Sequence, residues 1–219
     1  MSARNASIPY VAPFATFLLF LAISKLGGEG SSSAIYWAYP IQTVVCGAMI
    51  VFFRRYFSWQ LNQGLVFSLI AGLLVLGIWV APQVSGFSGP RTEGFNPDLF
   101  RSGTFSYSAI LGLRFLRLAL VVPIVEELFW RGFLLRYLIA TRFDSVPFGT
   151  FSWSSFLIVS LLFAAEHAQQ DWLPGLLAGG IYNAVAYRTK SLSCCVVAHA
   201  ITNFGLGIYI VRTRQWGFW

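Results

Sequence analysis

The chain contains little charge. Only 11% of its 219 residues are Asp, Glu, Lys or Arg, whereas soluble domains carry about 25%. Hydrophobic residues make up 57% of the chain, which is more apolar surface than the interior of a soluble fold of this length can bury. The composition therefore excludes an ordinary soluble domain. It indicates an integral membrane protein whose solvent is the lipid bilayer.

Cysteines are few, and no run of basic residues is present. Cys46, Cys194 and Cys195 lie in apolar segments without a CxxC spacing, so the sequence indicates no disulfide framework. The net charge is +7, but Arg and Lys stand mainly at the ends of apolar runs, as the topogenic charges of membrane proteins do. This distribution argues against a nucleic-acid-binding patch.

Seven apolar runs are present, and a spanning helix needs about 20 mainly apolar residues. The runs cover roughly 10–26, 34–53, 64–81, 118–140, 151–166, 174–187 and 192–211. Segment 107–117 carries Arg114 and Arg117 and is expected to be an amphipathic lead-in helix, separated from the next helix by Pro123. We therefore expect an all-α polytopic membrane helical bundle of about seven to eight helices.

One long loop divides the chain. Residues 82–106 are rich in Gly, Ser and Pro and follow three expected helices within residues 1–81. The catalytic helices are expected within 107–219, and the whole chain, 1–219, is interpreted as a single integral membrane domain. The positive-inside rule favours seven spans with a cytoplasmic N-terminus, although Arg212 and Arg214 count against that topology.

Ionisable residues inside the apolar runs are the most informative feature. A charged side chain at the centre of a membrane costs about 2.5 to 3.5 kcal/mol on insertion, so such residues are candidates for function. Five of the eight acidic residues lie in predicted loops, namely Glu29, Glu93, Asp98, Asp144 and Asp171. The other acidic residues and both histidines lie in or at the ends of apolar runs, namely Glu126, Glu127, Glu166, His167 and His199.

The first motif contains two adjacent glutamates and an arginine. Glu127 and Arg131 are four residues apart, so they share one helix face and can form an ion pair. Glu126 points about 100° away from that face and stays free. A free buried carboxylate has a raised pKa and is suited to accept a proton. The structural alternative is a salt bridge that only holds helices together.

Two further motifs contain the histidines. His167 ends the segment Phe163–His167, where a lone histidine is more often a capping or interfacial residue, and the neighbouring Glu166 receives no role. His199 and Asn203 share a helix face and can donate two hydrogen bonds to one point, as a developing oxyanion requires. The alternative is ordinary hydrogen bonding between membrane helices. Together the three motifs suggest attack of water on an amide.

The order Glu-Glu-x-x-x-Arg, Phe-x-x-x-His and His-x-x-x-Asn, each on a separate membrane helix, resembles the CAAX prenyl protease and bacteriocin-processing (CPBP, Abi) family of intramembrane glutamic proteases. The resemblance covers roughly 118–207, and this region is also similar to CAAX protease-related proteins found beside bacterial exosortase systems. It implies an intramembrane endopeptidase with an α-helical fold. By this resemblance, the water-activating residues are Glu126 and His167, the oxyanion residues are His199 and Asn203, and the supporting residues are Glu127 and Arg131.

The resemblance also implies partners and a location. The expected substrate is a peptide or protein, with membrane-anchored and lipidated substrates among the options, and the expected location is the cytoplasmic membrane of a prokaryote. No cofactor is expected. The weaker alternative is zinc held by Glu126, His167 and His199, although no His-Glu-x-x-His pair is present.

Other functions are less favoured by the sequence. Gly86-Phe-Ser-Gly89 is similar to the serine motif of rhomboid-type proteases, but it lies in the long loop without an obvious buried base. An aspartyl mechanism is disfavoured because every Asp lies outside the apolar runs. The main alternative is a transporter or membrane scaffold in which the Glu, His and Arg residues form a buried proton relay.

Overall fold

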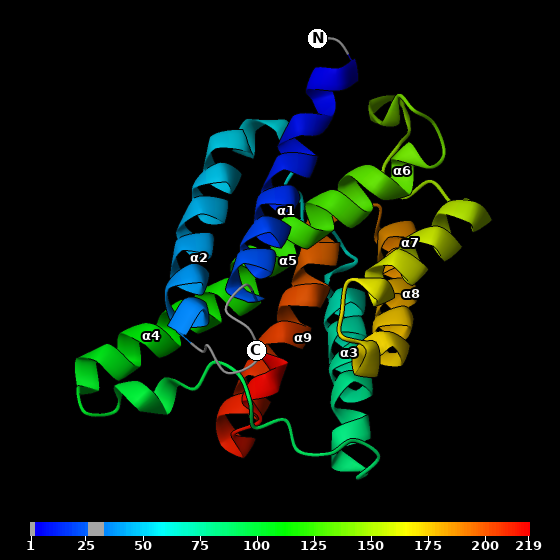
Figure 1. Ribbon diagram of the computed structural model, residues 1–219. Helices are drawn as coiled ribbons and strands as arrows, with labels where there is room; N and C mark the ends of the chain where they lie inside the picture. The colour runs from blue at the N-terminus through cyan, green and yellow to red at the C-terminus, as the bar shows by residue number, and fades with distance from the viewer. Residues whose placement is uncertain (1–2, 26–32) are drawn as a thin grey trace.

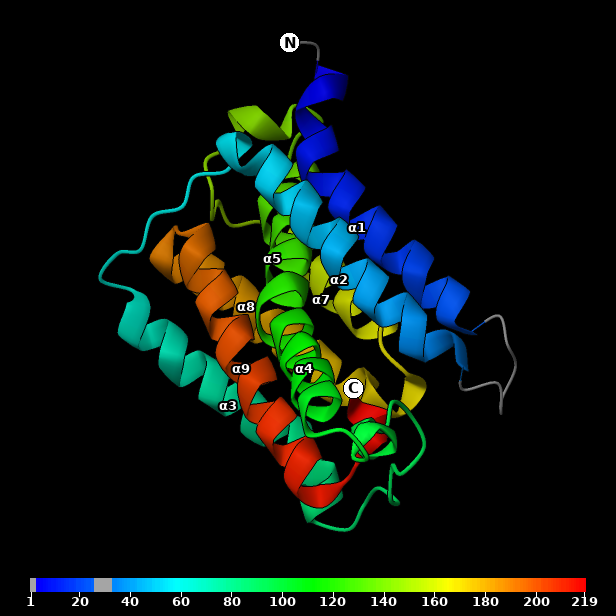
Figure 2. The same cartoon turned by 90° about the vertical axis from the view of Figure 1, so that its left-hand side faces the viewer.

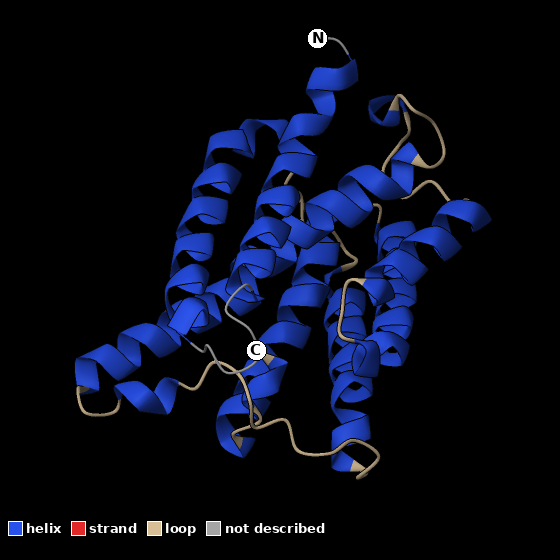
Figure 3. Ribbon diagram, in the orientation of Figure 1, coloured by secondary structure: helices blue, strands red, loops and turns tan. Residues whose placement is uncertain are grey.

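The computed structural model describes residues 3–25 and 33–219, and within these ranges it contains helices and loops but no strand (Figure 3). The helices are α1 (Ala3–Lys25), α2 (Ser33–Phe53), α3 (Leu65–Val84), α4 (Thr104–Leu116), α5 (Val122–Glu127), α6 (Leu135–Tyr137), α7 (Trp153–Ala165), α8 (Trp172–Thr189) and α9 (Leu192–Thr213). The expected all-α bundle is confirmed. The predicted loop residue Glu29 lies outside the described residues.

Helices α4, α5 and α6 are parts of one long helix. The segments that join them, Arg117–Val121 and Leu128–Leu134, are π-type turns in which each N–H bonds to the carbonyl five residues earlier. The prediction that Pro123 separates a lead-in helix from the next helix is therefore wrong. Pro123 lies at the start of α5, directly after a π turn. Pro123 has no N–H to donate, but the helix continues through this position without a break.

This long helix lies at the centre of the bundle (Figures 1 and 2). Helices α1 and α2 pack as a pair on one side of it, and α3 packs along α9 on another side. Helices α7 and α8 form a third pair, and both α8 and the long helix contact α9. The three motifs therefore come from elements that meet around α9.

Small residues set the closest helix approaches. A Cβ atom on Gly72 of α3 would lie 2.4 Å from the Ala198 carbonyl oxygen of α9. A Cβ atom on Gly179 of α8 would lie 3.0 Å from the Ser160 Cα of α7. Close backbone contact through small residues is the usual packing mode of membrane helices. It brings α3 close to α9 and α8 close to α7.

Within the described residues, five helices are long and apolar enough to cross a membrane: Ala6–Ser24, Ala34–Tyr56, Leu65–Val84, Ser106–Tyr137 and Leu192–Thr213. Seven spans were expected from the apolar runs. The run at 151–166 forms the short helix α7 of 13 residues, and α8 is not among the five candidates. Helix α8 contains Gly175, Gly179, Gly180 and Asn183 in place of larger apolar side chains, because these residues pack against protein instead of lipid.

Candidate active site

One cavity of about 330 Å³ contains all four predicted catalytic residues. Glu126 reaches it from the central helix, and His167 reaches it from the segment that follows α7. His199 and Asn203 line it from α9. The sequence placed these residues on three separate helices, and the fold brings them to one space.

Glu127 and Arg131 form the ion pair that their spacing predicts. Arg131 Nη1 donates to Glu127 Oε1 at 2.9 Å, and neither side chain is exposed. The other arginine nitrogens are also occupied, because Nε donates to Asn183 Oδ1 and Nη2 donates to the Gly179 carbonyl, both at 3.0 Å. Arg131 therefore connects the central helix to α8 and is fixed by three separate hydrogen bonds.

The same glutamate orients His199. The Nδ1–H of His199 donates to Glu127 Oε1 at 2.9 Å, and this bond leaves Nε2 directed away from Glu127. The imidazole also stacks on the Tyr182 ring at a centroid distance of 4.9 Å. The Tyr182 hydroxyl donates to Thr202 Oγ1 at 2.7 Å. Both the plane and the tautomer of His199 are thus set by neighbours.

Glu126 faces the free nitrogen of this imidazole. Glu126 Oε2 lies 3.9 Å from His199 Nε2, which is beyond direct hydrogen-bond distance. Oε2 is buried and has no hydrogen-bond partner. Glu126 is therefore the free carboxylate of the pair, as the 100° offset from Glu127 predicts, and its polar atoms are directed to the cavity.

His167 is held by its own segment. Its Nδ1–H donates to the Phe163 carbonyl at 2.7 Å, so the neutral ring offers the lone pair of Nε2 as an acceptor. The ring packs against Trp79 and Phe163 with centroid distances of 5.0 and 5.1 Å. His167 lies beyond the end of α7 and outside the five candidate spans. Burial lowers its pKa, which favours the neutral, proton-accepting form.

Asn203 is fixed by a carbonyl that the central helix leaves free. Asn203 Nδ2 donates to the Leu118 carbonyl at 2.9 Å. In the π turn the carbonyl of Arg117 bonds to the N–H five residues later, at Val122. The corresponding donor for Leu118 would be residue 123, but Pro123 has no N–H. The side-chain amide of Asn203 takes that place and keeps its second hydrogen for another acceptor.

Glu166 lies in the same cavity, although the sequence assigned it no role. Both of its carboxylate oxygens are buried and have no hydrogen-bond partner in the part of the chain that the structure describes. It follows α7 and lies outside the five candidate spans. Burial raises its pKa to about 8, while the Trp130 indole and the Arg131 charge oppose that rise. Glu166 is therefore predominantly protonated at neutral pH.

Arg117 also lines this cavity, and the sequence analysis missed it. Arg114 and Arg117 were interpreted as the polar face of an amphipathic helix, but both are buried, with exposed fractions of 3% and 5%. No signal in the sequence marks Arg117 as a site residue, because its burial depends on the π turn that continues into the buried Glu126 segment.

Metal binding receives no geometric support within residues 3–25 and 33–219. No group of three or more His, Cys, Asp or Glu side chains there is arranged to hold a metal ion. Cys46, Cys194 and Cys195 are buried free thiols. The zinc alternative at Glu126 and the two histidines stays a matter for experiment.

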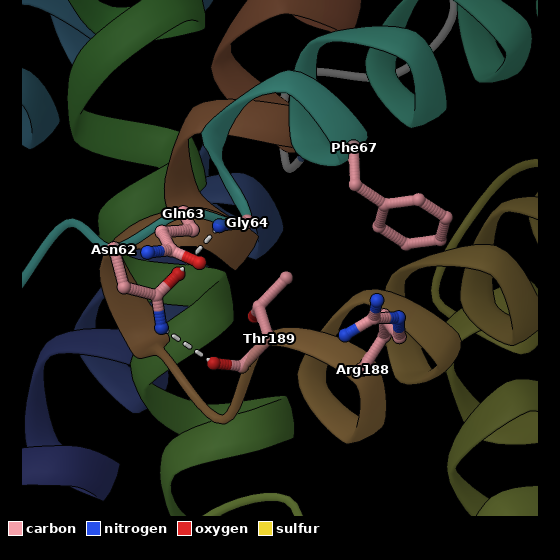
Figure 4. Close-up of a pocket in the computed structure, with 6 residues that line it drawn as sticks. All are labelled: Asn62, Gln63, Gly64, Phe67, Arg188 and Thr189. Carbon is pink, nitrogen blue, oxygen red and sulfur yellow. Dashed lines mark hydrogen bonds between the residues drawn. The ribbon is translucent and has the colours of Figure 1, made fainter.

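A second cavity, of about 590 Å³, lies between the start of α3 and the end of α8 (Figure 4). It is lined by Asn62, Gln63, Gly64, Phe67, Arg188 and Thr189. Asn62 Nδ2 donates to the Thr189 carbonyl at 2.6 Å, and Asn62 Oδ1 accepts from the Gly64 N–H at 2.9 Å. Arg188 is the one ionisable side chain in this lining, so the cavity offers no acid–base pair for hydrolysis.

Comparison with known proteins gives one match. Residues 107–205 match the model of the family described as type II CAAX prenyl endopeptidase Rce1-like. No curated protein and no solved structure matches the chain. The matched segment contains all seven residues of the three motifs, and it begins at the start of the region where the catalytic helices were expected. The narrower placement beside exosortase systems stays a prediction.

Proposed function

We propose that the protein is an intramembrane endopeptidase that cleaves a peptide bond with activated water, because residues 107–205 match the Rce1-like type II CAAX prenyl endopeptidase family. The observation that carries the proposal is the shared cavity of Glu126, His167, His199 and Asn203. The proposed substrate is a peptide or protein, including membrane-anchored or lipid-modified ones. The proposed location is the cytoplasmic membrane of a prokaryote.

In the proposed reaction, water enters between the acid–base residues and the substrate carbonyl. Glu126 and His167 accept the proton as the water oxygen attacks the carbonyl carbon. Glu126 suits this role because its Oε2 has no hydrogen-bond partner. His167 suits it because its Nδ1–H is occupied by the Phe163 carbonyl, so its free nitrogen is an acceptor.

The negative oxygen that forms on the substrate would be stabilised by Asn203 and His199. Asn203 has one amide hydrogen left after its bond to Leu118. His199 donates its Nδ1–H to Glu127, so its Nε2 donates to the oxyanion only when the ring is protonated. When the C–N bond breaks, the proton taken from water moves to the leaving nitrogen, and the charges return to their starting values.

A comparison of membrane proteomes tests the proposal. Cells that produce the wild-type protein should contain cleavage products that disappear with Glu126→Gln and with His199→Ala. Glu93→Gln is the matched control, because Glu93 is exposed and lies in the long loop. Equal processing by wild-type and Glu126→Gln protein would contradict the proposal.

The alternatives give different outcomes in the same system. A transporter with a buried proton relay would show altered uptake or proton coupling and no processed peptide. A zinc enzyme would lose activity with a strong chelator and regain it with zinc. We expect cleavage to survive the chelator, since glutamate and histidine supply the base.

A further inference from the structure

Two buried arginines lie on the central helix without a carboxylate partner. Arg114 and Arg117 are three residues apart, so they occupy neighbouring positions on one face of the helix. Their exposed fractions are 3% and 5%. Neither takes part in any of the ion pairs formed within the described ranges. A buried charge without a partner costs several kcal/mol, so an anion at this position would be strongly stabilised.

The neighbours of Arg117 satisfy only part of its guanidinium group. Its Nε donates to Gln42 Oε1 at 2.6 Å, and Gln42 Nε2 in turn donates to the Phe17 carbonyl at 2.7 Å. These two hydrogen bonds hold the Nε side of the Arg117 guanidinium group in place. Its two terminal nitrogens make no hydrogen bond to any described residue. Arg117 lines the cavity that contains Glu126, so these nitrogens are the free donors of its guanidinium group.

Arg114 adds a second positive charge behind Arg117. None of its three guanidinium nitrogens has a hydrogen-bond partner among the described residues. The group lies against the rings of Tyr39, Phe95 and Trp219 at 4.6, 4.6 and 4.7 Å. Aromatic faces stabilise a cation, but they leave its positive charge without a counter-ion. Arg114 therefore raises the positive potential at Arg117 without contacting the cavity.

The acid–base residues lie farther along the same helix. Arg117 and Glu126 are nine residues apart, which separates them by roughly 13 to 14 Å along the axis at the rise of an α-helix. A peptide whose scissile bond lies at Glu126 can therefore extend toward Arg117. The aromatic residues Tyr39 and Trp219 line the cavity together with Arg117.

We propose that Arg117, supported by Arg114, forms a subsite that binds a carboxylate of the substrate peptide. The proposal rests on the proposed endopeptidase function and names a chemical feature of its substrate. A planar guanidinium group with two free terminal nitrogens matches the two oxygens of a carboxylate. The carboxylate belongs either to the end of the peptide chain or to an Asp or Glu side chain.

Four degenerate peptide libraries test this subsite. Two libraries contain no Asp or Glu, one with a free C-terminal carboxylate and one with an amidated C-terminus. The other two libraries contain Asp and Glu and have the same two kinds of C-terminus. Initial cleavage rates are measured by mass spectrometry with the wild-type protein in detergent. We expect carboxylate-bearing peptides to be cleaved with a kcat/KM roughly tenfold to a hundredfold above that of neutral peptides, the range of a charge-assisted hydrogen bond. The arm that shows this advantage identifies the source of the carboxylate.

Variants of Arg117 connect the effect to the residue. Arg117→Gln should lose the tenfold to hundredfold advantage, so that its kcat/KM for carboxylate-bearing peptides falls to its own value for neutral peptides. A cooperative melting curve in detergent shows that the variant is folded. Arg117→Lys should retain part of the advantage, because it keeps the charge but loses the planar fork. Arg101→Gln is the matched control, since the Arg101 side chain is 58% exposed.

The possible failures can be told apart. Equal cleavage of all four libraries by the wild-type protein would overturn the subsite, while loss of that cleavage in Glu126→Gln would preserve the endopeptidase function. If the wild-type protein cleaved no library, the endopeptidase proposal would fail. In that case, thermal stabilisation of the protein by the three libraries that carry a carboxylate, but not by the amidated library without Asp and Glu, would still support the binding site. Equal stabilisation by all four libraries would overturn it.

Discussion

Glu126 and Glu127 are adjacent in the sequence but occupy opposite electrostatic situations. Glu127 Oε1 accepts hydrogen bonds from Arg131 and from His199, so its charge is used to hold two other helices in place. Each glutamate has one buried oxygen without a partner among the described residues, but Glu126 accepts no hydrogen bond from a described side chain and lines the cavity. The same substitution at the two positions should therefore separate stability from catalysis.

Glu127→Gln should destabilise the protein, whereas Glu126→Gln should not. Removing the Glu127 charge leaves Arg131 buried without a counter-ion, and such losses cost about 3 to 5 kcal/mol. Glu126→Gln replaces an unpaired buried carboxylate by a neutral amide, so stability should stay equal or rise while cleavage is lost. Thermal unfolding in detergent, followed by circular dichroism, measures the difference. Equal destabilisation by both substitutions would contradict this division of roles.

Glu166 gives a pH dependence of known sign. Its pKa is raised by burial from 4.5 to about 8 in the folded protein, so between these values the folded state binds more protons than the unfolded state. The free energy of unfolding therefore falls as the pH rises from about 4.5 to about 8. Glu166→Gln should remove this contribution. The melting temperature of the variant should exceed that of the wild type at pH 8.5, and the two should converge near pH 4.5.

The control for this prediction is Glu93→Gln, which changes an exposed glutamate in the long loop. It should melt like the wild type at both pH values. Parallel pH profiles for wild-type and Glu166→Gln protein would show that the Glu166 carboxylate is not held protonated by the fold.

At the scale of elements, the π turns of the central helix decide how the site is assembled. A π turn rotates the residues that follow it relative to a regular α-helix, and such turns are frequent at functional sites. The turn at Arg117–Val121 precedes the glutamates, and the turn at Leu128–Leu134 contains Arg131. The first turn and Pro123 together leave the Leu118 carbonyl available to Asn203.

Pro123→Ala should weaken catalysis without weakening the fold. The new N–H can bond to the Leu118 carbonyl and compete with Asn203 for it, so the amide loses its fixed position. We expect kcat to fall by roughly tenfold, since positioning errors of this kind reduce rates strongly, while the melting temperature stays equal or rises. Pro82→Ala in α3 is the control and should leave kcat unchanged. An unchanged kcat in Pro123→Ala would show that this carbonyl does not position Asn203.

At the scale of the whole molecule, a buried ion pair ties the long loop to the segment that precedes α8. Arg91 donates to both oxygens of Asp171 at 2.9 and 2.7 Å. Its guanidinium also lies 4.1 Å from the centre of the Phe218 ring. Asp171 and Phe218 line the cavity, so this contact closes one side of the candidate active site with residues that are distant in the sequence.

A double-mutant cycle on Arg91→Ala and Asp171→Ala should give a coupling energy of about 1 to 3 kcal/mol. The two side chains are only 8% and 11% exposed, and close pairs of this kind couple within that range. Arg101 and Asp98 supply the comparison, because their pair is largely exposed on the arginine side and should couple by less than about 1 kcal/mol. Chemical unfolding in detergent measures both cycles. Equal coupling would contradict the closing role of Arg91.

Much of this architecture was accessible from the sequence because lipid imposes simple rules. Low charge and long apolar runs predict an all-α membrane bundle, since backbone groups must be bonded within each helix. The rarity of charge inside those runs also identified Glu126, Glu127, His167 and His199, and helical spacing paired Glu127 with Arg131. These inferences depend on composition and on the spacing of residues within one helix, and both can be read directly from the sequence.

Contacts between distant segments were decided only by the tertiary structure. Nothing in the spacing of residues 117–131 indicated two π turns, because a π turn depends on what the helix packs against. Nothing indicated that Arg117 is buried beside the site, that Glu166 has no partner, or that Arg91 reaches Asp171. Each depends on side chains that are about 40 to 80 residues apart in the sequence and meet only in the folded protein. The burial of a side chain and its hydrogen-bond partners are set by the packing of the whole bundle and not by one helix.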